Sequence, residues 1–141
     1  MKVLHFIKMA YYRLFYFFFR YGEIVDKNSA YPDNSIKFAS VTGIMLLSMV
    51  VFIDLLTAFW CVSRFLVKLP TIGPWLFASI ILLIFLANLT LFFRKKRYVK
   101  IVEHFRNEAE NAKGFRTFLC AVFTLFSLFT ISIFGIRFGN P

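Results

Sequence analysis

Residues 41–63 spell VTGIMLLSMVVFIDLLTAFWCVS, an apolar run that carries a single acid, Asp54, near its middle. About 20 apolar residues, each rising about 1.5 Å in a helix, match a hydrocarbon core about 30 Å thick. The run therefore predicts a transmembrane helix, which we expect to cover residues 36–65. Asp54 would then lie about 18 Å along the span, close to the membrane midplane.

Two further apolar segments, residues 75–93 and 115–136, are also long enough to cross a bilayer. The composition agrees, because 60% of the 141 residues are hydrophobic and 21% are aromatic, which is too apolar for an ordinary soluble domain. We therefore expect one all-α membrane domain over residues 1–141 with three transmembrane helices.

The N-terminal segment, residues 1–21, has the pattern of a basic amphipathic helix. Its cations, Lys2, Arg13 and Arg20, share one sector of a helical wheel, and aromatic and aliphatic residues fill the other. A helix of this kind typically lies in the membrane interface and binds anionic headgroups. The alternative is that its apolar face packs on the protein's own helices, and both arrangements are compatible.

A basic linker, residues 94–113, connects the second and third spans. It begins with four cations, Arg94, Lys95, Lys96 and Arg97, and then carries an apolar stripe at helical spacing. The chain must return to the membrane for the third span, so a straight helix projecting into water is excluded. We expect either a bend at residues 94–97 followed by an in-plane amphipathic helix, or a hairpin that breaks near residues 107–111.

The charge distribution predicts the orientation of the chain. Six of the 17 lysines and arginines precede the first span, eight lie between Arg94 and Arg116, and three lie on the other side. By the positive-inside rule, the N-terminus and the linker are expected in the cytoplasm and the C-terminus outside. This arrangement accounts for the net charge of +10 without nucleic acid. The layout is similar to that of small bacterial inner-membrane proteins, so we expect the bacterial inner membrane.

Asp54 is the candidate functional residue, since a carboxyl group at the midplane is costly and is usually retained for a role. Small and polar residues share its face and predict a contact between the first and third helices, because small side chains allow close approach. The predicted interface residues are Gly43, Thr57, Ala58 and Cys61 in the first span, and Thr124 and Ser127 in the third.

Three partners for Asp54 fit the sequence. The carboxyl group could be protonated and hydrogen-bonded to a hydroxyl of the third span, where Ser127 and Thr130 lie at the same depth. It could instead meet Asp54 of other copies, in a ring at a pore or proton site. A cation on another protein is the third possibility, because no Lys, Arg or His of this chain lies at that depth.

The sequence carries no pattern of catalytic, metal-ligating or cofactor-binding residues, so we expect neither an enzyme nor a cofactor. Our first hypothesis is a self-associating membrane protein that conducts ions or permeabilises the membrane, with Asp54 at the constriction. The second is an accessory or scaffold subunit that docks a soluble cytoplasmic partner through its basic amphipathic helices. Anionic lipids are expected partners in both.

Overall fold

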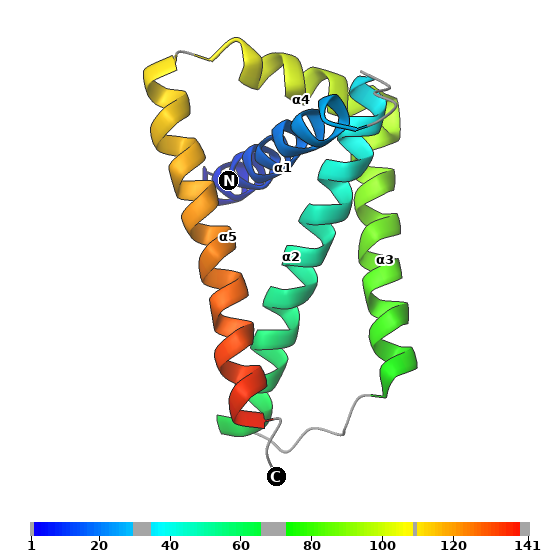
Figure 1. Cartoon of the computed structure of the whole chain (residues 1–141), viewed down its shortest axis with the longest axis vertical. Coiled ribbons are helices and arrows are strands. Elements are labelled where there is room, and N and C mark those ends of the chain that lie inside the picture. The colour runs from blue at the N-terminus through cyan, green and yellow to red at the C-terminus, as the bar shows by residue number, and fades with distance from the viewer. Residues whose placement is uncertain (1, 30–34, 66–72, 109, 139–141) are drawn as a thin grey trace.

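The computed structural model describes residues 2–29, 35–65, 73–108 and 110–138, and these ranges contain helices and turns but no strand (Figure 1). A short 3-10 turn, η1, joins the third helix to the fourth. In chain order the elements are α1 (Lys2–Lys27), α2 (Ile36–Phe65), α3 (Pro74–Phe93), η1 (Arg94–Lys96), α4 (Arg97–Arg106) and α5 (Glu110–Phe138).

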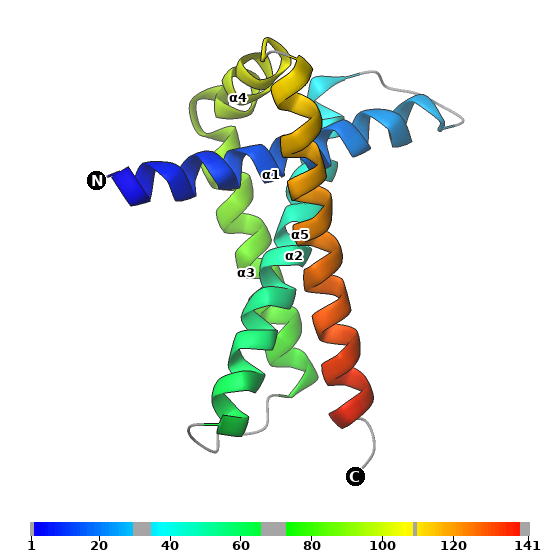
Figure 2. The ribbon, with the colours of Figure 1, turned by 90° about the vertical axis from the view of Figure 1, so that its left-hand side faces the viewer.

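Three helices, α2, α3 and α5, are long and apolar enough to cross a membrane, which confirms this part of the predicted fold. They run lengthwise through the molecule, and α2 packs against both of the others (Figures 1 and 2). Little of their apolar surface is covered within the protomer. The buried share of the most apolar stretch is 22% in α2, 11% in the span beginning at Pro74 and 6% in α5.

The N-terminal helix α1 runs crosswise to the three long helices near one end of the bundle (Figure 2). The middle of its apolar face, which includes Leu14, Phe15, Phe18 and Phe19, is buried against its main neighbour α2, whereas the apolar residues before residue 8 are exposed. This middle part packs on the protein's own helices, and the expected position of α1 in the membrane interface stays a prediction. Contact between the opposite face and lipid headgroups stays a prediction.

Two glycines set the distance between α1 and α2. A Cβ added to Gly22 of α1 would lie 2.8 Å from the carbonyl oxygen of Ala39, and one added to Gly43 of α2 would lie 2.9 Å from the backbone nitrogen of Phe19. Both contacts are shorter than a methyl group tolerates against backbone atoms. The two helices therefore cross with their backbones in direct contact, an arrangement that small residues permit.

Aromatic side chains join α1 to α3 and α4. Phe92 of α3 is fully buried, and its ring centroid lies 4.3 Å from that of Phe15. Phe105 of α4 packs against Tyr16 with the ring centroids 5.6 Å apart, and the Arg13 guanidinium lies 4.7 Å from the centroid of the same ring. These contacts hold α4 against α1 at the same end of the bundle (Figure 2).

The linker between α3 and α5 differs from the predicted helix over residues 94–113. The predicted bend is present, since Lys95 and Lys96 have positive φ values of 55° and 52°. The predicted alternative break is also present, because α4 ends at Arg106 and α5 begins at Glu110. The bend and the break occur together. The bend turns the chain across the bundle, and the break lets it continue into the third long helix.

Two helices extend beyond the predicted segments, and each continues through a glycine. We expected the N-terminal helix to end at residue 21, but α1 continues through Gly22 to Lys27; residue 1 lies outside the described range. We expected the third span to begin at residue 115, after Gly114, but α5 begins five residues earlier. Neither glycine ends a helix here, because Gly22 is needed for the contact with α2 and Gly114 is an ordinary exposed helical residue.

A hydrogen-bonded chain of side chains links α1, α3 and α2 inside the bundle. The Tyr11 hydroxyl donates to Asn88 Oδ1, Asn88 Nδ2 donates to Ser48 Oγ at 3.0 Å, and Ser48 Oγ donates to the Ile44 carbonyl at 2.7 Å. Asn88 and Ser48 are buried. This chain satisfies the polar groups of three helices at once, which matters most where no water can substitute.

We expect Asn88→Leu to lower the free energy of unfolding by about 1 kcal/mol, because the Tyr11 hydroxyl and the Ser48 hydroxyl each lose a partner between helices. Unfolding by a denaturing detergent, followed by circular dichroism, measures the change. Thr90→Val is the matched control, since Thr90 is exposed and its hydroxyl donates only to Leu86 of its own helix. Equal losses in both variants would show that the inter-helix bonds do not contribute.

Candidate functional site

Asp54 lies on the continuation of the buried face of α2. Gly43, Leu47 and Val50 of this face are buried, whereas Asp54 and the residues that follow at the same spacing, Thr57 and Cys61, are only partly buried. The inner face of α2 is thus covered where α1 crosses it and progressively uncovered toward the other end of the helix. Asp54 is the first residue beyond the covered part.

No hydrogen bond or ion pair connects the Asp54 carboxylate to another side chain within the described ranges. One turn further along, the Thr57 hydroxyl is buried and also has no hydrogen-bond partner. The α5 hydroxyls expected at this depth, Ser127 and Thr130, donate to the carbonyls of Phe123 and Phe126 in their own helix. Two polar groups in the middle of an apolar helix are therefore left without partners among the residues that the structure describes.

The small-residue face of α5 is its inner face. Cys120 and Ser127 are buried and Thr124 is partly buried, while the large residues on the other side, such as Phe126 and Phe129, are 68% and 65% exposed. Among the long helices, α5 packs against α2. Thr124 and Ser127 thus lie on the more buried side of α5.

The predicted interface residues of α2 do not share one environment. Gly43 packs against Phe15 and Phe19 of α1, so the N-terminal helix is its partner. Cys61 is partly buried, and Ala58, one turn beyond Asp54, is exposed. The surface beside Asp54 is therefore open on the Ala58 side.

The basic residues predicted to bind lipid headgroups or a partner lie in α1 and at the bend after α3. Lys2 is exposed at the far end of α1, and Arg20 lies in the part of α1 near α4 and α5. Residues 94–97 lie at the bend between α3 and α4; Arg94, Lys95 and Lys96 are exposed there and Arg97 is partly buried. Within the described part of the chain, none of these four bend residues forms an ion pair.

Arg13 has a different environment, because it belongs to a network of ion pairs between α1, α4 and α5. Its guanidinium nitrogens donate to both carboxylate oxygens of Glu108, at 2.6 and 2.9 Å, and Arg116 of α5 binds the same carboxylate. The hydrogen bonds from Arg13 hold the pKa of Glu108 below its usual value, so Glu108 is ionised at neutral pH. Glu23 of α1 similarly pairs with Arg20 and with Arg106 of α4.

Sequence patterns did not predict the ion pair between Arg13 and Glu108 or the one between Glu23 and Arg106. A spacing rule finds pairs three or four residues apart in one helix, but 83 residues separate Glu23 from Arg106 and 95 separate Arg13 from Glu108. In the ranges that the structure describes, no group of three or more His, Cys, Asp or Glu residues is arranged to hold a metal ion.

Comparisons of the chain with protein-family models, with curated proteins and with solved structures find no match. The function is therefore inferred from the chain itself. Its two chemically distinctive regions are the unpartnered polar pair in α2 and the basic region where α1, α4 and α5 meet.

Proposed function

We propose that the chain is a non-enzymatic integral membrane protein that self-associates through α2 and α5 and conducts ions or protons past Asp54. One observation carries the proposal: a carboxylate in the middle of a span has no partner among the described residues of its own chain. The positive-inside pattern supports the expected orientation, with α1 and α4 on the cytoplasmic side of a bacterial inner membrane.

A polar group in lipid is energetically costly unless it has a partner. An unpaired ionisable side chain at the bilayer centre costs about 3 kcal/mol on insertion scales, and such residues usually face a partner or a water-filled cavity. The apolar stretches of α2, α3 and α5 contain no Lys, Arg or His to pair with Asp54. Partners supplied by a second copy, or water between copies, would satisfy Asp54.

The uncovered surface of the protomer supports assembly. Exposed large apolar residues line one side of α5, and the α2 surface next to Asp54 continues through the exposed Leu55 and Ala58. Lipid can cover the apolar residues, but it cannot pair with Asp54. A second copy placed on this side of α2 would cover the carboxylate and exclude acyl chains from it.

The experiment measures the number of copies and the ion flux of the full chain in the same membrane. Native mass spectrometry of nanodiscs counts the copies in one assembly, and a pH-sensitive dye inside liposomes measures flux. We expect more than one copy and a flux above that of protein-free liposomes. Ala58→Trp, on the surface beside Asp54, should reduce both the number of copies and the flux. Leu83→Trp should change neither quantity, because Leu83 is 65% exposed on the outer side of α3. A monomer that leaves liposomes tight would contradict the proposal.

A second candidate function, a scaffold that docks a soluble partner, is favoured by the bend at residues 94–97. Lys95 and Lys96 are consecutive non-glycine residues with positive φ, a strained arrangement that is enriched at functional sites. The bend presents cations that have no partner within the described ranges. Co-purification of a soluble protein, lost on charge reversal of residues 94–97 while the copy number stays one, would favour this function over conduction.

A further inference from the structure

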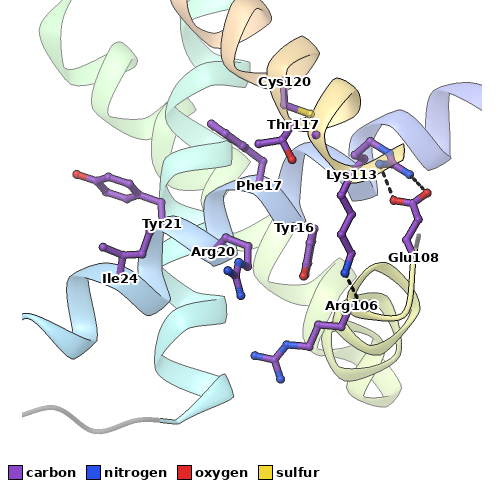
Figure 3. Close-up of a pocket in the computed structure, with 12 residues that line it drawn as sticks. Tyr16, Phe17, Arg20, Tyr21, Ile24, Arg106, Glu108, Lys113, Thr117 and Cys120 are labelled. Atoms are coloured by element: carbon purple, nitrogen blue, oxygen red, sulfur yellow. Dashed lines mark hydrogen bonds and ion pairs between the residues drawn. The ribbon is translucent and has the colours of Figure 1, made fainter. Parts of the chain in front are cut away.

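A pocket of about 800 Å³ opens where α1, α4 and the beginning of α5 meet (Figure 3). Its volume is in the range of about 300–1,000 Å³ typical of small-molecule sites. Three of its cations, Arg13, Arg20 and Arg106, come from α1 and α4, and Lys113 comes from α5. The other lining residues are Tyr16, Phe17, Tyr21, Ile24, Glu108, Gly114, Thr117 and Cys120.

The pocket has a surplus of positive charge. Glu108 is the one acid among its lining residues, and Arg13 and Arg116 already bind it. Among the described side chains, Lys113 donates to the backbone carbonyl of Arg106 at 2.6 Å, and a carbonyl does not neutralise its charge. Figure 3 shows Arg20 and Lys113 on either side of the Tyr16 ring. An anion in this pocket would therefore meet cations from more than one helix.

The other wall of the pocket is apolar and faces outward. Phe17 is partly buried, Tyr21 and Ile24 are each 54% exposed, and Thr117 and Cys120 belong to the apolar stretch of α5. The wall thus leads from the cations onto the surface of a helix that is long and apolar enough to cross a membrane. A free phosphate ion would use the cations but would leave this wall uncovered.

We propose that this pocket binds the phosphate group of an anionic glycerophospholipid, with one acyl chain lying against Phe17, Ile24 and the apolar part of α5. The phosphate would accept hydrogen bonds from Arg20 and Lys113, in the way that phosphate oxygens accept them from Arg and Lys elsewhere. The bound lipid would link α5 to α1 and α4. This site is independent of the proposed conduction, and either proposal can fail without the other.

The test uses the full chain in a neutral detergent, with dioleoylphosphatidylglycerol as the probe and native mass spectrometry as the measurement. The Arg20→Gln/Lys113→Gln double variant removes two pocket cations and the Arg20–Glu23 pair, but keeps both partners of the Arg13–Glu108 pair and of the Glu23–Arg106 pair. We expect its apparent Kd for the lipid to rise about tenfold, since charge-assisted hydrogen bonds to phosphate are lost. Wild type should bind dioleoylphosphatidylcholine at least about tenfold more weakly than dioleoylphosphatidylglycerol.

The matched control is Lys27→Gln/Lys37→Gln, which removes the same charge from exposed positions outside the pocket. We expect it to bind the lipid as wild type does, and circular dichroism should show both double variants to be folded. Three results would overturn the proposal: an equal loss of affinity in the control, equal affinity for the two lipids, or complete displacement of the lipid by millimolar inorganic phosphate. The last result would assign the site to the free anion.

Discussion

Gly43→Ala is expected to destabilise the fold by about 3 kcal/mol, at the upper end of the cost of overpacking. The added methyl group would lie 2.9 Å from the backbone nitrogen of Phe19 and 3.1 Å from its Cα. Backbone atoms cannot move aside by changing rotamer, so α1 must shift away from α2. The separation would also weaken the contacts of Phe15 with α3. Denaturing-detergent titrations give the stability, and hydrogen exchange of α1 amides reports whether α1 has separated.

Gly114→Ala is the control for this substitution, because nothing lies within 4 Å of the added Cβ and the residue is inside α5. Alanine has a higher helix propensity than glycine, so this variant should gain up to about 1 kcal/mol. Gly22→Ala, on the other side of the crossing, should behave as Gly43→Ala does, since its Cβ would meet the Ala39 carbonyl. If Gly43→Ala were as stable as Gly114→Ala, the close crossing of α1 and α2 would be wrong.

The long helices are predictable from the sequence, because the length and hydropathy that allow a helix to cross a bilayer are properties of each segment alone. An apolar run of sufficient length identifies a span whatever it packs against, and the predicted bounds 36–65 agree with α2 at both ends. The bend at residues 94–97 was likewise predictable, because the chain has to return to the membrane within a short linker. Both arguments use only length and hydropathy.

Properties that depend on a distant neighbour could not be predicted in this way. Gly22 has the local character of a helix end, and only the backbone of Ala39 explains why glycine stands inside a continuous helix. Gly43 shares the small-residue pattern of Asp54, but its partner is α1 instead of the third span. The pocket cations were identified as basic, yet their grouping with Lys113 depends on how α1, α4 and α5 come together.

The position of Asp54 relative to the α1–α2 crossing connects the fold to the proposed function. The crossing at Gly43, the aromatic contacts of Phe92 and the Asn88 hydrogen bonds all stabilise one end of the bundle. Beyond Val50 the inner face of α2 has no comparable cover. The stabilised end of the bundle can keep its contacts while copies associate through the uncovered face of α2 around Asp54. Association therefore does not require the protomer to unfold.

Asp54→Asn is expected to reduce ion or proton flux into liposomes at least about tenfold, because the amide has nearly the same shape but cannot carry a negative charge or exchange a proton. The substitution should change the free energy of unfolding by no more than about 0.5 kcal/mol, since the carboxylate makes no hydrogen bond or ion pair in the described protomer. The substitution should therefore lower the flux and leave the free energy of unfolding almost unchanged. A residue needed only for folding would change both together.

Two variants complete this measurement. Asp54→Glu keeps an ionisable group one methylene further from the backbone and should retain part of the flux. Glu103→Gln makes the same acid-to-amide change at an exposed position of α4 and should conduct as wild type does. Copy number in nanodiscs must be equal in all four proteins for the comparison to isolate the carboxylate. Equal flux from wild type and Asp54→Asn would show that ions do not pass this group, and the unpaired acid would then mark a contact with a different protein.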